Sequence, residues 1–170
     1  GVTLAGTLTA RNSAIAVSGN WANTGTFTAG GSTVTFDAAA GTQTLNSGAS
    51  SFYNLTHSGA GTLQLVANNL DLTGAFANSA GTFDAFALAN TVTGLATLSG
   101  GTYSASTAAQ TFNGGLTISG GTLTGASGAV DVNGSLVLSS GVLTAPSGAF
   151  TVSGNWSKTG GTFTPGTNNV

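Results

Sequence analysis

Few side chains in this 170-residue chain could perform acid–base or nucleophilic chemistry. Glycoside hydrolysis needs two carboxyl groups about 5–9.5 Å apart, which makes the four aspartates the first candidates. The chain has one histidine and no cysteine, so a metal site or a nucleophile–base pair would have to be assembled around a single ring. Apart from two tyrosines, the ionisable side chains are Arg11, Asp37, His57, Asp71, Asp84, Asp131 and Lys158.

Glycines at a fixed spacing set the frame in which these side chains lie. The phrase Gly-Thr-Leu-Thr, or a variant of it, also begins at Gly6 and Gly25, with shorter spacings. A fixed period of this length is typical of repeat architectures, in which each unit buries its apolar side chains only against its neighbours. The glycines that open the phrase every 20 residues are Gly41, Gly61, Gly81, Gly101, Gly121, Gly141 and Gly161.

Each repeat contains three short patches of alternating apolar and polar residues, such as GTLT, AVDVN and SLVLS in the repeat that begins at Gly121. This alternation predicts short strands with one buried face, and the Gly, Ser and Asn residues between the patches suit corners. We therefore expect one all-β domain over residues 1–170, a single-stranded parallel β-solenoid with right-handed winding and a triangular cross-section. It would have about eight coils of about 20 residues and three strands each, with irregular coils around residues 29–60.

This frame separates the ionisable side chains. Asp71 and Asp131 share one position of the repeat but lie three coils apart, about 14 Å at the usual strand spacing. Asp84 falls on another face. His57 aligns with the inward-facing Ile118, so we expect a partly buried ring with a hydrogen-bond partner. The sequence therefore predicts no catalytic residue, no metal site and no cofactor.

Two outward files of threonine are the one candidate binding surface. The second and fourth positions of the repeat flank a buried position, and Thr stacks well on a parallel sheet. Such a face resembles the ice-binding face of solenoid antifreeze proteins, and its hydroxyls could also bind carbohydrate, although Gln64, Asp84 and Ser104 interrupt it. The candidate residues are Thr7, Thr9, Thr26, Thr28, Thr42, Thr44, Thr122, Thr124, Thr162 and Thr164.

Trp21 and Trp156 follow the same Ser-Gly-Asn sequence and are aligned at one position of the repeat. A pair of exposed tryptophans could stack on sugars. Because the other residues at this position are mostly Leu or Phe, we expect both rings to pack in the core.

Composition excludes several partners. The formal net charge is −2 and charged residues make up 4% of the chain, so no basic stripe can neutralise nucleic acid phosphates. No apolar run is long enough for a membrane-spanning helix, so we expect no membrane insertion of this segment.

Three phrases carry a resemblance to a known class. SGNWANTGTFTAGGSTVTF (18–36), FYNLTHSGAGTLQL (52–65) and SGNWSKTGGTFTPGTNNV (153–170) resemble repeats of large secreted bacterial surface proteins of the filamentous-haemagglutinin and autotransporter-passenger type. The likeness covers nearly the whole chain. It implies a location outside the cell, at the cell surface, and a structural or adhesive role.

The ends suggest the partners. Val2 and Leu4 align with the third strand of later repeats, and the last repeat breaks off inside a coil. Either adjoining coils of a longer chain cover the ends, or copies stack end to end into a filament. The expected contacts are Val2, Leu4, Phe163 and Val170.

The function expected from these observations is a non-enzymatic extracellular structural protein, either a filament subunit or the shaft of a bacterial adhesin. An ice- or carbohydrate-binding module that uses the threonine files is the alternative. A polysaccharide-active enzyme is disfavoured by the small number of ionisable groups.

Overall fold

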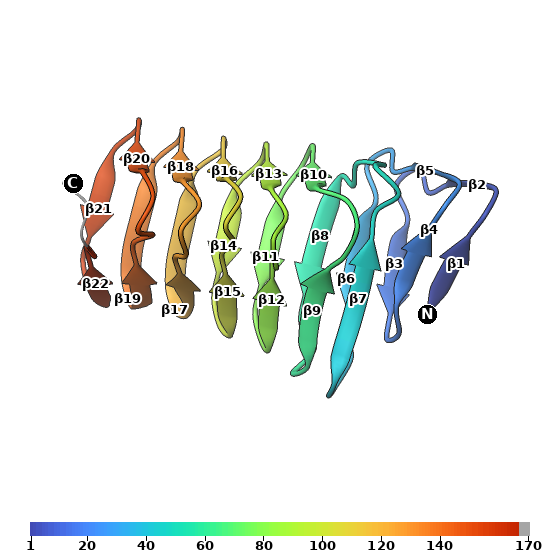
Figure 1. The fold of residues 1–170 in the computed structure, drawn as a ribbon, viewed down its shortest axis with the longest axis horizontal. Coiled ribbons are helices and arrows are strands. Elements are labelled where there is room, and N and C mark those ends of the chain that lie inside the picture. The colour runs from blue at the N-terminus through green and yellow to red at the C-terminus, as the bar shows by residue number, and fades with distance from the viewer. Residues whose placement is uncertain (167–170) are drawn as a thin grey trace.

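The computed structural model describes residues 1–166, which form a stack of short strands and corners with no helix (Figure 1). Each strand pairs in parallel with the strand one coil further on, so equivalent side chains lie in files along the axis. The fold is therefore a β-solenoid of about eight coils, and its winding agrees with the right-handed sense expected. One inward file runs through Leu63, Phe83, Tyr103, Leu123 and Leu143.

The first side of the coil, here called face A, carries the Gly-Thr phrases of the later coils. In the later coils the middle residue of each strand segment points inward, so the two residues that flank it point outward. Its strands are β1 (Val2–Leu4), β4 (Trp21–Asn23), β7 (Thr42–Asn46), β9 (Thr62–Leu65), β12 (Thr82–Asp84), β15 (Thr102–Ser104), the second halves of β17 (Leu116–Thr124) and β19 (Leu136–Thr144), and β22 (Thr162–Thr164).

The second side, face B, is a five-stranded sheet with two inward residues and one outward residue per strand. Near the N-terminus a separate two-stranded sheet takes this side, formed by β2 (Thr7–Thr9) and β5 (Thr26–Thr28) (Figure 1). Phe52 connects the two parts, because it bridges to Leu72 and its ring lies 5.0 Å from the ring of Phe27. The strands of the larger sheet are β10 (Leu70–Leu72), β13 (Asn90–Val92), β16 (Gln110–Phe112), β18 (Val130–Val132) and β20 (Phe150–Val152).

The third side, face C, joins face A in one 15-stranded sheet, because β17 and β19 run through the corner between them. Its strands are β3 (Ala14–Val17), β6 (Thr33–Phe36), β8 (Asn54–His57), β11 (Phe76–Asn78), β14 (Ala96–Leu98), the first halves of β17 and β19, and β21 (Trp156–Lys158).

Glycine is required where corners of successive coils stack directly. At the corner between faces B and C, a Cβ added to Gly114 would lie 2.4 Å from the backbone carbon of Gly94. No side chain fits at that distance, and Gly114 lies between β16 and β17, as expected for the glycines between the strand patches.

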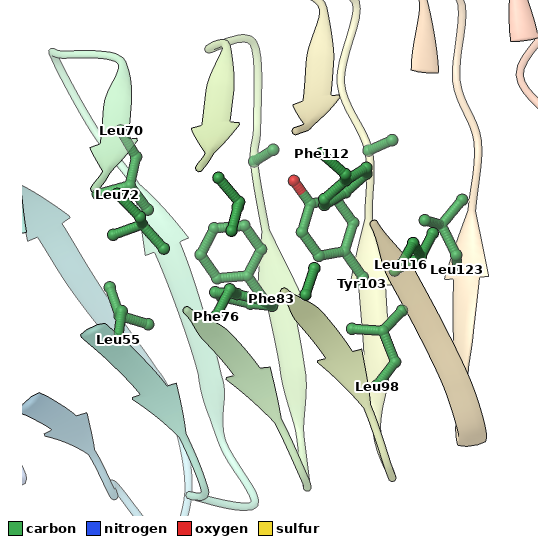
Figure 2. Packing of buried hydrophobic residues seen from close by; sticks show 14 of the residues in the cluster. Leu55, Leu70, Leu72, Phe76, Phe83, Leu98, Tyr103, Phe112, Leu116 and Leu123 are labelled. Atoms are coloured by element: carbon green, nitrogen blue, oxygen red, sulfur yellow. The ribbon is translucent and has the colours of Figure 1, made fainter. Parts of the chain in front are cut away.

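The inward files fill one continuous core (Figure 2). Phe83 and Tyr103, one coil apart, have ring centroids 5.0 Å apart, and the ring of Phe76 from face C lies 4.9 Å from that of Phe83. Each fully buried large side chain contributes about 1.5–3 kcal/mol, so every coil depends on its neighbours for its stability.

Coil length is irregular near the N-terminus, within the predicted range. Trp21 pairs with Leu45, 24 positions later, whereas later coils repeat every 20 positions. The part of β7 that precedes Leu45 therefore extends beyond the first residue of β4. Gln43 lies in this extension, and its amide nitrogen donates to the carbonyl oxygens of Val17 and Gly19, the latter at 2.6 Å.

The long second coil overturns the predicted alignment of the first repeats. Leu8 and Phe27 lie on face B rather than in the file of Leu63, and β1, with Val2 and Leu4, lies on face A instead of aligning with face C. Faces A and B both accept a strand with small polar flanks and an apolar centre, as β22 and β5 do with the same Thr-Phe-Thr sequence. A Gly-Thr-Phe-Thr phrase therefore fits whichever side the preceding coil length delivers it to.

The two tryptophans are separated for the same reason. Trp21 pairs with Leu45 on face A, while Trp156 pairs with Leu136 on face C. Trp21 is fully buried and Trp156 is half-buried in the last described coil, so both rings pack against the core as expected but not in one file.

Candidate functional site

Face A carries two outward files, which makes it the candidate binding surface. Neighbouring members are one coil apart, about 4.8 Å at the usual strand spacing. The first file runs through Thr42, Thr62, Thr82, Thr102, Thr122, Val142 and Thr162, and the second through Thr44, Gln64, Asp84, Ser104, Thr124, Thr144 and Thr164.

The predicted threonine surface is only partly assembled. The two-stranded sheet β2–β5, on face B, contains Thr7, Thr9, Thr26 and Thr28. These residues therefore do not extend the files of face A. On face A itself, no two adjacent coils of the described chain carry threonine at both outward positions. The hydroxyl array is therefore discontinuous.

The interruption in the middle of face A is a linked pair of side chains. Gln64 donates from its amide nitrogen to Asp84 Oδ2 at 2.8 Å, and Asp84 Oδ1 accepts from the backbone N–H of Phe86 at 2.8 Å. The carboxylate and the amide thus hold each other in place on the outward side of the sheet, with further hydrogen-bonding capacity on both groups.

The other aspartates are dispersed, as predicted. Asp71 and Asp131 lie in one outward file of face B, with Thr91 and Thr111 between them. Asp37 accepts a hydrogen bond from Ser18 at 2.7 Å. Within residues 1–166, His, Cys, Asp and Glu side chains nowhere gather in a group of three that could hold a metal ion, and the surface of that part has no pocket.

His57 occupies an inward position of face C, as predicted. It aligns with Phe36 in the preceding coil and Asn78 in the next, and its Nδ1 lies 2.7 Å from Asn78 Oδ1. Burial lowers the pKa of the ring, and the Asn78 contact opposes this only in part. The ring therefore favours the neutral form in the folded protein.

We expect this neutral ring to make stability depend on pH. Because the pKa of His57 is lower in the folded than in the unfolded chain, the unfolded state takes up the proton first as pH falls below about 6.5. The unfolding free energy should then fall with decreasing pH, by at most about 1.4 kcal/mol per pH unit. Urea unfolding between pH 7 and 5 measures this slope, and His57→Leu should remove it. Equal slopes in the two proteins would contradict the assignment.

A second buried polar group lies behind the corner that follows β12. Tyr103 donates from its hydroxyl to Gln110 Oε1 at 2.5 Å and accepts from Asn90 Nδ2 at 2.7 Å. Burial raises the pKa of the tyrosine hydroxyl, which keeps it protonated, although the Asn90 hydrogen bond acts in the opposite direction. Gln110 in turn donates to the carbonyl oxygen of Leu88 at 3.0 Å, so the network anchors the corner from inside.

The two ends of the described stack expose part of the core. Val2 and Leu4 in the first coil and Phe163 in the last are half-buried, while the fourth predicted end contact, Val170, lies outside the described residues. Lys158 pairs with Leu138 in the inward file of face C. The last coil therefore places a charge where the two preceding coils place the buried apolar residues Ile118 and Leu138.

Two residues of interest were missed in the sequence. Gln43 stands in the file of Leu63 and Phe83, and its polar side chain marks the irregular coil. Phe86 stands where the other late coils have Val, Ser, Ala or Pro. In both cases the signal was a residue unlike its equivalents in the repeat.

The geometry thus defines the class of the protein as a β-solenoid, in a chain of which only 4% of the residues are charged. Comparison with protein-family models, with curated proteins and with solved structures finds no match to this chain. Residues 1–166 also contain no helix that is long and apolar enough to cross a membrane.

Proposed function

We propose that this protein is a non-enzymatic structural element of an extracellular bacterial assembly, either a filament subunit or the shaft of an adhesin. The observation that carries the proposal is the continuity of the ladder and core along one axis. Each coil is stabilised by the coils on either side, so the natural partner of an end coil is another coil.

The ends support stacking by adjoining coils or by a second copy. Half-buried apolar residues remain at both ends, with Val2, Leu4 and Ile15 at one and Trp156 and Phe163 at the other. Strand edges of this kind pair readily with further strands. A head-to-tail contact of this type does not close, so repeated contacts would produce a fibre.

The resemblance of the repeats to secreted surface proteins supports an extracellular location. The surface also suits it, because only 4% of the residues are charged and little on the surface responds to salt or pH. Ice binding receives less support, because no two adjacent coils of the described chain carry threonine at both outward positions of face A.

Lys158 gives the proposal a sharp test. A coil stacked on β21 would bury its ammonium group beside the file that ends with Leu138, at a cost of several kcal/mol unless it is paired. We expect Lys158→Leu to lengthen the assemblies and to lower the concentration at which they form by at least tenfold. Sedimentation velocity and negative-stain microscopy of the purified chain measure both effects.

Ser157→Leu is the matched control, because it adds the same side chain on the outward side of the same strand. It should leave end-to-end association unchanged. Compact single particles for the parent protein and for Lys158→Leu at all concentrations would reject stacking through this end.

A further inference from the structure

The coil that begins at Gly81 departs from the repeat at the corner between faces A and B. Phe86 is 61% exposed there, the highest value among the large apolar side chains of the described chain. At the equivalent position of the two flanking coils, Val66 is half-buried and Ser106 is buried. The eight other phenylalanines are buried or half-buried. The chain therefore presents one phenylalanine ring to solvent at a position where its neighbours do not.

The backbone holds the ring in this place at a conformational cost. Phe86 has a φ of +54°, in the left-handed region that bulky side chains rarely adopt. Asp84 stabilises the turn by accepting the backbone N–H of Phe86 at 2.8 Å. Strained residues that the surroundings hold in place cluster at binding sites.

Partly buried hydrogen bonds fix the same corner from the core side. The carbonyl oxygen of Leu88 accepts from Ser106 Oγ at 2.8 Å and from Gln110 Nε2 at 3.0 Å, and the N–H of Leu88 donates to the carbonyl of Ala85 at 2.9 Å. The segment that carries Phe86 is thus a rigid platform. Rigid platforms lose little conformational entropy when they bind a ligand.

Hydrogen-bonding groups belong to the same turn as Phe86 and to the strand that leads into it. Asp84 and Gln64, linked at 2.8 Å, stand on the outward side of face A at the edge that leads into this corner. Each carboxylate oxygen of Asp84 has a second lone pair, and no described group donates to Gln64 Oε1. The hydroxyls of Thr62 and Thr82 occupy the adjacent outward file.

We propose that Phe86, Asp84 and Gln64 form a contact site for a neutral polysaccharide. The C–H groups on one face of a pyranose ring are apolar and pack on an aromatic ring, while its hydroxyls pair with a carboxylate and an amide. A peptide would need a larger apolar surface, and a metal ion would need more than one carboxylate. The site lies on an open corner, which suits a chain of sugars along face A. This inference does not depend on the assembly proposed above.

Saturation-transfer difference NMR tests the site on either single molecules or fibres, because it observes the sugar. The probes are cellohexaose, mannohexaose and maltohexaose, each at about 10 mM, above the millimolar Kd of a weak site. We expect irradiation of the aromatic protons to saturate the protons on one face of the sugar rings of at least one probe. Phe86→Ala should reduce this signal at least tenfold, and Asp84→Ala should weaken it several-fold.

Two control variants distinguish binding at this site from nonspecific binding to exposed apolar side chains. Leu95→Ala removes another exposed apolar side chain and should leave the signal unchanged. Ala126→Phe places a ring at the equivalent corner of a coil without the carboxylate and amide, and should not create a second site. Circular dichroism verifies the fold of each variant. No signal with any probe, or a signal that survives Phe86→Ala, would overturn the proposal.

Discussion

Replacing Trp21 by alanine should destabilise the protein by about 3–5 kcal/mol, the range expected when a fully buried tryptophan is lost from a core. The ring lies where the first coils meet the regular stack. Its centroid is 5.0 Å from that of Phe27, 5.2 Å from that of Phe52 and 6.4 Å from that of Phe36. Removing it would leave three aromatic rings facing a cavity. Urea unfolding followed by circular dichroism measures the loss.

Trp156 provides a matched control within the same chain, because it follows the same Ser-Gly-Asn sequence. It is half-buried in the last described coil, so Trp156→Ala should cost roughly half of the about 1.5–3 kcal/mol that complete burial contributes. Equal losses of stability for the two variants would show that the shared sequence context, rather than the different burial of the two rings in the structure, determines the contribution of each ring.

The period and the alternation were sufficient to predict the architecture. Leu63, Phe83, Tyr103 and Leu123 are 20 positions apart and stack in one file, because a parallel ladder places equivalent residues of successive coils side by side. The corner glycines and the inward position of His57 followed from the same register. These features depend only on the spacing within regular coils.

The placement of the first repeats could not be predicted in this way. Thr7 and Thr26 carry the same phrase as Thr42 but lie on another side, since the 24-residue step from Trp21 to Leu45 changes the phase. The phrase does not specify its side, because the same Thr-Phe-Thr sequence forms β5 on face B and β22 on face A. The length of the intervening corners determines which side of the coil the phrase occupies, and corner length has no simple pattern in the sequence.

The candidate glycan site shows a second limit. Asp84 and Gln64 were visible as interruptions of the threonine file, but their hydrogen bond and the exposure of Phe86 depend on the turn after β12. The apolar residues at the equivalent corner of other coils are covered at least in part, because Val66 is half-buried and Pro146 is buried. Phe86 instead combines a left-handed backbone conformation with a side chain that is 61% exposed.

Gln43→Leu should lower the unfolding free energy by about 1–3 kcal/mol, although the repeat pattern alone predicts the opposite. The equivalent residue in the next coil is Leu63, so the pattern indicates that leucine would improve the core. In the structure, however, the amide of Gln43 donates to Gly19 at 2.6 Å and accepts from the backbone N–H of Ala38 at 3.4 Å. Leucine would leave both backbone groups without these partners. Urea unfolding decides between the two predictions.

Gln43→Met separates the lost hydrogen bonds from a change of shape, because methionine keeps the length of the side chain. It should cost about as much as Gln43→Leu. Gln64→Thr is the control on the outward side of the neighbouring strand, where restoring the hydroxyl file should change stability by no more than about 0.5 kcal/mol. If Gln43→Leu stabilises the protein, the regular stack does not need the hydrogen bonds of the Gln43 side chain. The irregular coil would then be tolerated by the fold rather than held in place by Gln43.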